Sequence, residues 1–222
     1  MQIKLYTNKL TIKDIDNIIN SNGEILKDDI RSFIKVVEYK NKKYLYKIPR
    51  DKNKRLLKKL FSPLVGSESY NLIQGMLFLK NINITSNEPI ALIEKKFLGF
   101  VYWSALICTY IEGKIPEESD LAQIIKLLNK LHSYKVYHKD SQFSNFIINN
   151  SSIALIDFVP HKAILGQISY AHDFVKLKNS RPKIEKYLPE SITKSKAYKL
   201  AKIYDNIIKK WRKLKKIKRR LF

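Results

Sequence analysis

Residues 136–158 read VYHKDSQFSNFIINNSSIALIDF, and this stretch decides the fold that we expect for the chain. Asp140 lies five residues before Asn145, and Asp157 follows twelve residues after Asn145. Two short apolar runs flank the polar residues 149–152, a pattern that predicts a β-hairpin with a turn at its centre. This hairpin is expected to bring Asn145 and Asp157 together.

The three residues Asp140, Asn145 and Asp157 suit the transfer of a phosphoryl group. Such a reaction needs a carboxylate beside the acceptor hydroxyl and oxygen ligands that hold Mg²⁺ against the nucleotide phosphates. We expect Asp140 to orient and deprotonate the acceptor, and Asn145 and Asp157 to bind Mg²⁺. The alternative is a polar loop that only caps a core hairpin, but the complete pattern favours a phosphoryl-transfer site over that alternative.

The motif H-x-D-x4-N, which starts at His138, and the strand ending in Asp157-Phe158 together resemble the catalytic and metal-binding loops of the protein-kinase-like superfamily. The resemblance implies an α+β, two-lobed fold. Its N-lobe would be a small antiparallel β-sheet with one helix, and its C-lobe would be mainly helical. The resemblance also implies ATP and Mg²⁺ as cofactors.

Lys47 lies in the second strand of a hairpin that the pattern of residues 33–48 predicts. By resemblance it matches the lysine that grips the nucleotide phosphates in kinases. Glu68 lies at the start of the next predicted helix and is the acid that would pair with Lys47 in a kinase. The alternative role of Glu68 is to complement the positive N-terminus of that helix.

The predicted sheet ends at Tyr110, Ile111 and Glu112. In kinases this exit is the hinge whose backbone pairs with adenine, so the resemblance makes these three residues nucleotide-binding. The same resemblance places the lobe boundary after Glu112, with a nucleotide-binding lobe over residues 1–112 and a catalytic lobe over residues 113–222.

Two further residues have more than one possible role. His138 precedes Asp140 by two residues and is expected to brace the loop by packing rather than to take a proton. Asp173 resembles the aspartate that supports the catalytic loop of kinases from behind, but it could also be an ordinary acid at a helix start.

Composition limits the class of protein. The chain has 222 residues, of which 45% are hydrophobic, and is therefore long enough to bury a substantial core. Its apolar runs are too short to span a bilayer and its first residues do not begin a signal peptide, so we expect a cytoplasmic protein. Cys108 is the single cysteine, which excludes an internal disulfide and a cysteine zinc site.

The formal charge of +23 indicates an anionic partner, which could be nucleic acid, a phospholipid surface or a phosphorylated glycan. Nine of the fourteen residues over 209–222 are Lys or Arg, interleaved with apolar residues. A basic amphipathic helix of this kind, predicted from about Lys194, suits peripheral contact with an anionic membrane. The alternative is a solvated helix packed on the large lobe, and nucleic acid is favoured less.

The acceptor is indicated by what the chain lacks and by a second resemblance. Only residues 159–172 lie between the Asp157-Phe158 motif and Asp173. This segment is too short to be an activation segment on which a peptide substrate could dock. The strings PLVGSESY at 63–70, LFLK at 77–80 and TYIEG at 109–113 resemble the bacterial lipopolysaccharide core heptose(II) kinases. This resemblance implies transfer of the ATP γ-phosphoryl group to an inner-core heptose of a lipid-linked glycan, at the inner face of the cytoplasmic membrane.

The sequence departs from this family at two places. Lys139 stands where sugar-directed relatives usually have glycine, and the expected phosphate loop, residues 25–33, contains no glycine. Two alternatives therefore stay open. One is an atypical small protein kinase of the tRNA-modification-associated type, and the other is a nucleic-acid-binding pseudokinase.

Overall fold

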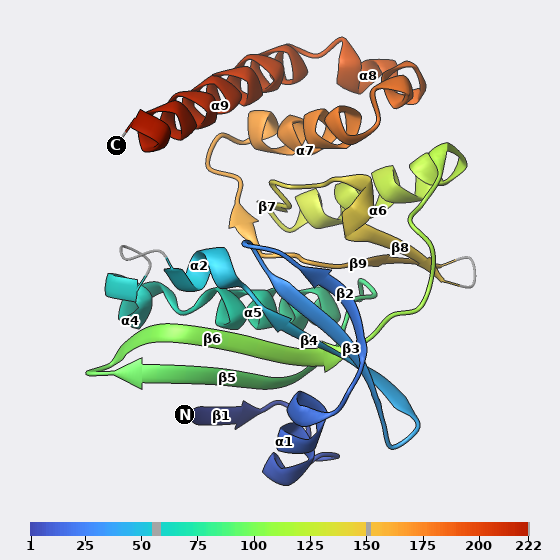
Figure 1. Ribbon diagram of the computed structural model, residues 1–222. Helices are drawn as coiled ribbons and strands as arrows, with labels where there is room; N and C mark the ends of the chain where they lie inside the picture. Colours follow the sequence, from blue (N-terminus) through green and yellow to red (C-terminus); the bar gives the residue numbers. More distant parts are fainter. Residues whose placement is uncertain (55–58, 150–151, 222) are drawn as a thin grey trace. The chain divides into compact units, whose positions relative to one another are not determined.

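The computed structural model describes residues 1–54, 59–149 and 152–221 (Figure 1). The chain divides into two compact units, the first formed by Met1–Glu112 with Ala154–Val159 and the second by Gly113–Ile153 with Pro160–Phe222. Two residues of the predicted turn, Asn150 and Ser151, lie outside the described residues.

The first unit is built on one antiparallel sheet. Within the described residues this sheet has six strands in the order β1-β5-β6-β4-β3-β2. The predicted hairpin over 33–48 is confirmed by the pairing of β3 with β4. The strand bounds are β1 (Gln2–Leu5), β2 (Glu24–Asp28), β3 (Phe33–Tyr39), β4 (Lys42–Ile48), β5 (Pro89–Phe97) and β6 (Phe100–Thr109).

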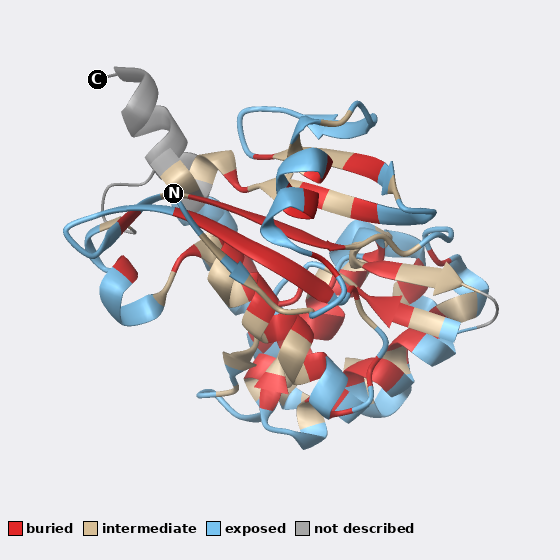
Figure 2. Ribbon diagram, turned by 90° about the horizontal axis from the view of Figure 1, so that it is seen from below, coloured by how far each residue is buried: buried red, intermediate tan, exposed pale blue. Residues whose placement is uncertain are grey.

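Helices cover both faces of this sheet, because alternate side chains of each strand point to opposite sides. On one face, α1 (Ile12–Asn20) buries Ile15 and Ile18 completely. On the other, α5 (Glu68–Asn81) packs through residues such as Leu72 and Ile73. Burial concentrates in the strands and in the helix faces that meet them (Figure 2). Each fully buried Ile or Leu contributes about 1.5–3 kcal/mol, so these two layers hold the sheet rigidly. Two shorter helices, α2 (Arg50–Lys54) and α4 (Ser62–Val65), follow β4.

The second unit is mainly helical. The short 3₁₀ turn η1 (Glu118–Asp120) precedes α6 (Leu121–Ser133), and Glu117 and Asp120 form a reciprocal cap at its start. The predicted hairpin after Asn145 is confirmed by the pairing of β8 with β9. The remaining elements are β7 (Val136–Tyr137), η2 (Phe143–Asn145), β8 (Phe146–Asn149), β9 (Ser152–Leu155), β10 (His161–Lys162), α7 (Gln167–Ser180), η3 (Pro182–Tyr187), α8 (Glu190–Thr193) and α9 (Lys196–Leu221).

The last helix, α9, packs beside α7 (Figure 1). It begins at Lys196, close to the predicted start at Lys194. None of the helices among the described residues is both long and apolar enough to cross a membrane.

Candidate active site

Lys47 and Asp157 form an ion pair in the first unit, although 110 positions separate them in the sequence. The Nζ of Lys47 lies 2.5 Å from Oδ1 of Asp157. The Lys47 side chain is 15% exposed and that of Asp157 is 45% exposed, so the pair lies at the edge of the protein interior. Asp157 has a φ of 56°, in the left-handed region that non-glycine residues adopt rarely and at a cost of about 1–3 kcal/mol. Such backbone strain is typical of functional sites.

The backbone around Asp157 is held by contacts on both sides. Leu155 N donates to Thr85 O at 2.9 Å. Phe158 is buried, and its ring centroid lies 6.1 Å from that of Phe78 on α5. A Cβ on Gly75 would lie 2.0 Å from the Phe158 carbonyl oxygen, so only glycine lets the helix approach this segment closely.

Cys108 lies on the face of the sheet that packs against α5 and is 1% exposed. Burial raises the pKa of its thiol to about 12, with smaller effects from Lys47 and Asp157. The thiol is therefore neutral at physiological pH and is not a nucleophile. Cys108 is therefore a residue of the apolar core.

Glu68 is the first residue of α5, and it follows the N-cap Ser67, whose Oγ accepts a hydrogen bond from Tyr70 N at 3.1 Å. The side chain of Glu68 is half-buried. The structure pairs Lys47 with Asp157, and the pairing of Lys47 with Glu68 stays a prediction.

The hinge residues Tyr110, Ile111 and Glu112 follow β6. Tyr110 N donates to Lys43 O at 3.0 Å, and the Glu112 carboxylate lies 2.5 Å from Lys43 Nζ. Because the Tyr110 N–H is already used, adenine would have to pair with other backbone groups of this segment. Binding of a nucleotide by these three residues stays a prediction.

The second unit carries Asp140 and Asn145 on one short loop. The exposed Asp140 carboxylate accepts a hydrogen bond from Gln142 Nε2 at 2.8 Å, and Asn145 Nδ2 donates to the Asp140 carbonyl at 2.6 Å. The second bond fixes the orientation of the Asn145 amide and leaves its oxygen as the atom suited to a cation.

Asp173 holds this loop from behind. It is completely buried, and its carboxylate accepts from the backbone N–H groups of His138 and Lys139, each at 2.8 Å. Ser141 Oγ donates to the Asp173 carbonyl at 2.7 Å, and His132 Nε2 lies 3.0 Å from Oδ2. Of the two roles open to Asp173, support of the loop is therefore the observed one. Neither Ser141 nor His132 is singled out by the sequence pattern.

The support from Asp173 also accounts for the departure at Lys139, whose φ is 69°. Glycine adopts this conformation freely, whereas a residue with a Cβ loses roughly 1–2 kcal/mol. The hydrogen bond from Lys139 N to Asp173 offsets that loss. His138 is buried with its ring centroid 6.3 Å from that of Phe146, as expected of a residue that braces the loop by packing.

The turn between β2 and β3 occupies the place of the expected phosphate loop. Asp29 Oδ1 accepts from Arg31 N at 2.8 Å and from Ser32 N at 2.7 Å, and the Ser32 bond is the largest cause of its lowered pKa. Arg50 bonds the Asp28 carboxylate and, at 3.1 Å, the Asp29 carbonyl. Side-chain hydrogen bonds thus shape a turn for which many kinases use glycine.

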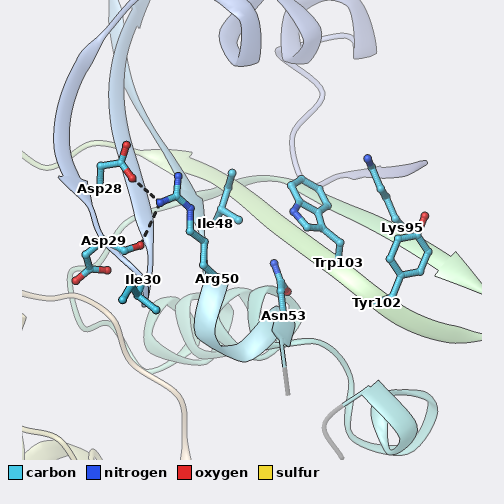
Figure 3. A pocket seen from close by; sticks show the side chains of 9 residues that line it. All are labelled: Asp28, Asp29, Ile30, Ile48, Arg50, Asn53, Lys95, Tyr102 and Trp103. Carbon is cyan, nitrogen blue, oxygen red and sulfur yellow. Dashed lines mark hydrogen bonds and ion pairs between the residues drawn. The ribbon is translucent and has the colours of Figure 1, made fainter. Parts of the chain in front are cut away.

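A cavity of about 750 Å³ lies beside this turn (Figure 3). Neither Lys47 nor Asp157 lines it, whereas the strand neighbours Tyr102 and Trp103, whose side chains point to opposite faces of the sheet, both do. This cavity is therefore not the place of the Lys47–Asp157 pair. It is lined by Asp28, Asp29, Ile30, Ile48, Arg50, Asn53, Lys95, Tyr102 and Trp103.

Among the described residues, no group of three or more His, Cys, Asp or Glu side chains is arranged to hold a metal ion. The predicted ligands Asn145 and Asp157 offer an amide oxygen and a carboxylate. This donor set fits Mg²⁺, which in nucleotide sites takes one or two protein oxygens together with phosphate oxygens and waters.

A family model described as "Lipopolysaccharide core biosynthesis protein (WaaY)" matches residues 8–181. The chain belongs to the WaaY family. This WaaY-family chain is also similar to a solved structure titled "WaaP in complex with acyl carrier protein", at 12% identity and a TM-score of 0.58, over 94% of this chain and 99% of that chain. The PknI kinase domain of Mycobacterium tuberculosis matches at 13% identity and a TM-score of 0.46, over 79% of this chain and 85% of that domain. No curated protein matches the sequence.

These findings confirm the expected relationship. The WaaY-family chain has an α+β, kinase-like fold and is related to the lipopolysaccharide core kinases.

Proposed function

We propose that this WaaY-family chain is an ATP-dependent kinase that phosphorylates a sugar hydroxyl, most specifically on a heptose of the lipopolysaccharide inner core. The observation that carries the proposal is the loop of Asp140 and Asn145. A completely buried carboxylate, Asp173, holds its backbone through two hydrogen bonds. Burial of a charge is costly unless hydrogen bonds compensate it, and here the compensating donors belong to the loop, so the same bonds position the Asp140 carboxylate.

Each residue then has a role that its chemistry supports. Asp140 is exposed and would accept the proton of the acceptor hydroxyl. Asn145 and Asp157 would hold Mg²⁺, which supplies neutralisation of phosphate charge. Lys47 would grip the nucleotide phosphates, and its pairing with Asp157 keeps its ammonium group extended.

The segment after Asp157 favours a glycan over a protein acceptor. It contains β10, which pairs with β7 through His161 and Tyr137, and α7 begins soon afterwards at Gln167. A short segment tied into a strand pair offers no extended platform on which a peptide could dock. We therefore favour a phosphorylated or lipid-linked glycan over the protein acceptor of an atypical protein kinase.

A lipid-linked acceptor requires the enzyme to work at a bilayer surface. The charge of +23 suits an anionic leaflet, and we expect the protein at the inner face of the cytoplasmic membrane. ATP is available on that side of the membrane.

The test is ADP release with Mg-ATP against a panel of acceptors. We expect turnover with a heptose-containing inner-core glycolipid and none with aminoglycosides or a generic protein. Chelation of divalent cations should abolish the turnover. Phosphorylation of the protein without glycan activity would support the atypical protein kinase, and salt-sensitive RNA binding without turnover would support the pseudokinase.

A further inference from the structure

The helix α9 carries an apolar stripe on its exposed side. Its members recur at helical spacing, so they lie along one side of the helix. Their exposed fractions are far above those of core residues. They are Leu200 at 49%, Ile203 at 56%, Ile207 at 53% and Trp211 at 61%, while Tyr204, at 38%, lies at the border with its ring against His172 of α7.

The orientation of this outward stripe is fixed by the opposite side of the helix. Tyr198, Ala201 and Asp205 are at most 1% exposed. Asp205 accepts hydrogen bonds from Lys176 at 2.5 Å and Asn179 at 2.9 Å, both on α7. At about 100° per residue, the centre of the outward stripe lies roughly 150° around the helix from these buried residues. The stripe therefore cannot turn inward without breaking the buried hydrogen bonds.

Cations accompany the outward stripe. Lys199 and Lys210 are exposed and lie along one side of it, whereas Lys202 lies toward the buried side of the helix and pairs with Glu185 at 3.3 Å. Asp205 is the one acid in the sequence of residues 196–222, and it is buried. The outer surface of the described part of α9 therefore presents apolar side chains beside positive charge, without a negative side chain between them.

We propose that the outward stripe of α9 is the face on which the protein lies on an anionic phospholipid bilayer. The apolar side chains would enter the boundary between headgroups and acyl chains, the Trp211 ring would lie at headgroup level, and the lysines would meet lipid phosphate. This proposal rests on the proposed function in one respect: the kinase activity on a lipid-linked glycan is the reason why the enzyme would need a membrane.

A nucleic acid is the weaker alternative, because phosphate binding would need the lysines and not the apolar stripe. A bilayer uses both. The two partners therefore predict different responses to the loss of apolar side chains.

The chain offers a matched control for apolar exposure. Phe97 and Leu98 at the tip of the β5–β6 hairpin are 70% and 80% exposed, in the first unit. The double variant Phe97→Ser/Leu98→Ser removes at least as much exposed apolar surface as Ile203→Ser/Ile207→Ser. Both variants leave every charge in place, and equal circular dichroism spectra and melting temperatures will show that both fold.

The experiment is co-sedimentation of the full chain with vesicles, without nucleotide. Vesicles of phosphatidylcholine with one quarter phosphatidylglycerol are compared with phosphatidylcholine alone. We expect Ile203→Ser/Ile207→Ser to weaken binding to the anionic vesicles about 30-fold. Phe97→Ser/Leu98→Ser should stay within about twofold of the natural sequence.

The charge contribution is tested by Lys199→Gln/Lys210→Gln, which should weaken binding about 25-fold on anionic vesicles and little on neutral ones. Equal binding by the natural sequence and the Ile203→Ser/Ile207→Ser variant would overturn the proposal, as would loss of binding in the hairpin variant alone. RNA binding that ignores the isoleucines, with no vesicle binding, would also overturn it. Since no catalysis is measured, failure here is distinct from failure of the proposed kinase activity.

Discussion

The buried carboxylate of Asp173 allows a sharp prediction. Asp173→Asn keeps one acceptor oxygen but turns an NH₂ group toward the backbone N–H of His138 or Lys139, and that N–H then has no acceptor. Charge-assisted hydrogen bonds are worth about 1.5–3 kcal/mol each, and a buried donor without a partner costs about 1–3 kcal/mol. We expect a loss of about 3 kcal/mol in the free energy of unfolding, which lowers the melting temperature by roughly 10 °C.

The same substitution should release the loop of Asp140. Without both hydrogen bonds, the left-handed Lys139 is no longer held, and a displacement of about 1 Å at the reacting group can cost about 100-fold in turnover. Two assays check this: ADP release at a temperature where the variant is folded, and hydrogen exchange of the His138 and Lys139 amides. We expect both amides to exchange faster.

Asp205→Asn is the matched control, because Asp205 is equally buried and also bonded to α7 but does not touch the loop. It should lose a similar amount of stability with turnover unchanged. If Asp173→Asn kept its stability, its amide protection and its turnover, the assigned role of Asp173 would be wrong. If Asp205→Asn lost turnover equally, the loss would reflect general destabilisation.

Three further predictions follow from single contacts. Burial would raise the pKa of Asp205, but its lysine partners hold that pKa at about 2, below its ordinary 3.8. The ionised carboxylate therefore stabilises the fold by about 2 kcal/mol above pH 4, and this stabilisation is lost as the pH falls towards 2. In the Asp205→Asn variant, the free energy of unfolding should therefore depend less on pH between 4 and 2. Gly75→Ala should lower the free energy of unfolding in denaturant by about 3 kcal/mol, because the added Cβ would lie 2.0 Å from a backbone oxygen. Gly99→Ala should lower it by about 1 kcal/mol, because Gly99 has a φ of 82° but open space around it. Equal losses in the two variants would contradict the close approach at Gly75. Lys47→Met should lower kcat/KM by at least about 100-fold. The control Lys80→Met, which breaks an exposed ion pair, should change kcat/KM by less than about threefold. Similar values of kcat/KM for the two variants would show that Lys47 does not act in the site.

The sequence predicts the features that depend on local pattern. The hairpin over 33–48 follows from alternating β-branched and aromatic residues, and the pairing of β8 with β9 follows from two apolar runs around a polar turn. The kinase-like fold is what the resemblance carried by the motifs of Asp140, Asn145 and Asp157 implies, and it is confirmed. Each of these signals lies within about 25 residues of sequence.

The remaining features depend on contacts between distant segments. The partner of Lys47 is Asp157, 110 positions away, and no periodicity encodes that pairing. Gly75 is needed because another part of the backbone passes its helix, although a lone glycine inside an apolar helical pattern can signal such an approach. The buried role of Asp205 was not expected in a helix where lysine predominates. It depends on α7 packing alongside, which the pattern of α9 alone does not reveal.

The central claim is that Asp140 takes the proton of the acceptor in a phosphoryl transfer. The most direct measurement is ADP release with Mg-ATP and inner-core glycolipid by Asp140→Asn, beside Asp16→Asn, an exposed aspartate of α1, as control. We predict a fall in turnover of about 1000-fold for Asp140→Asn, with the thermal stabilisation by Mg-ATP retained, and no change for Asp16→Asn. Near-normal turnover by Asp140→Asn would contradict the assignment of the catalytic base.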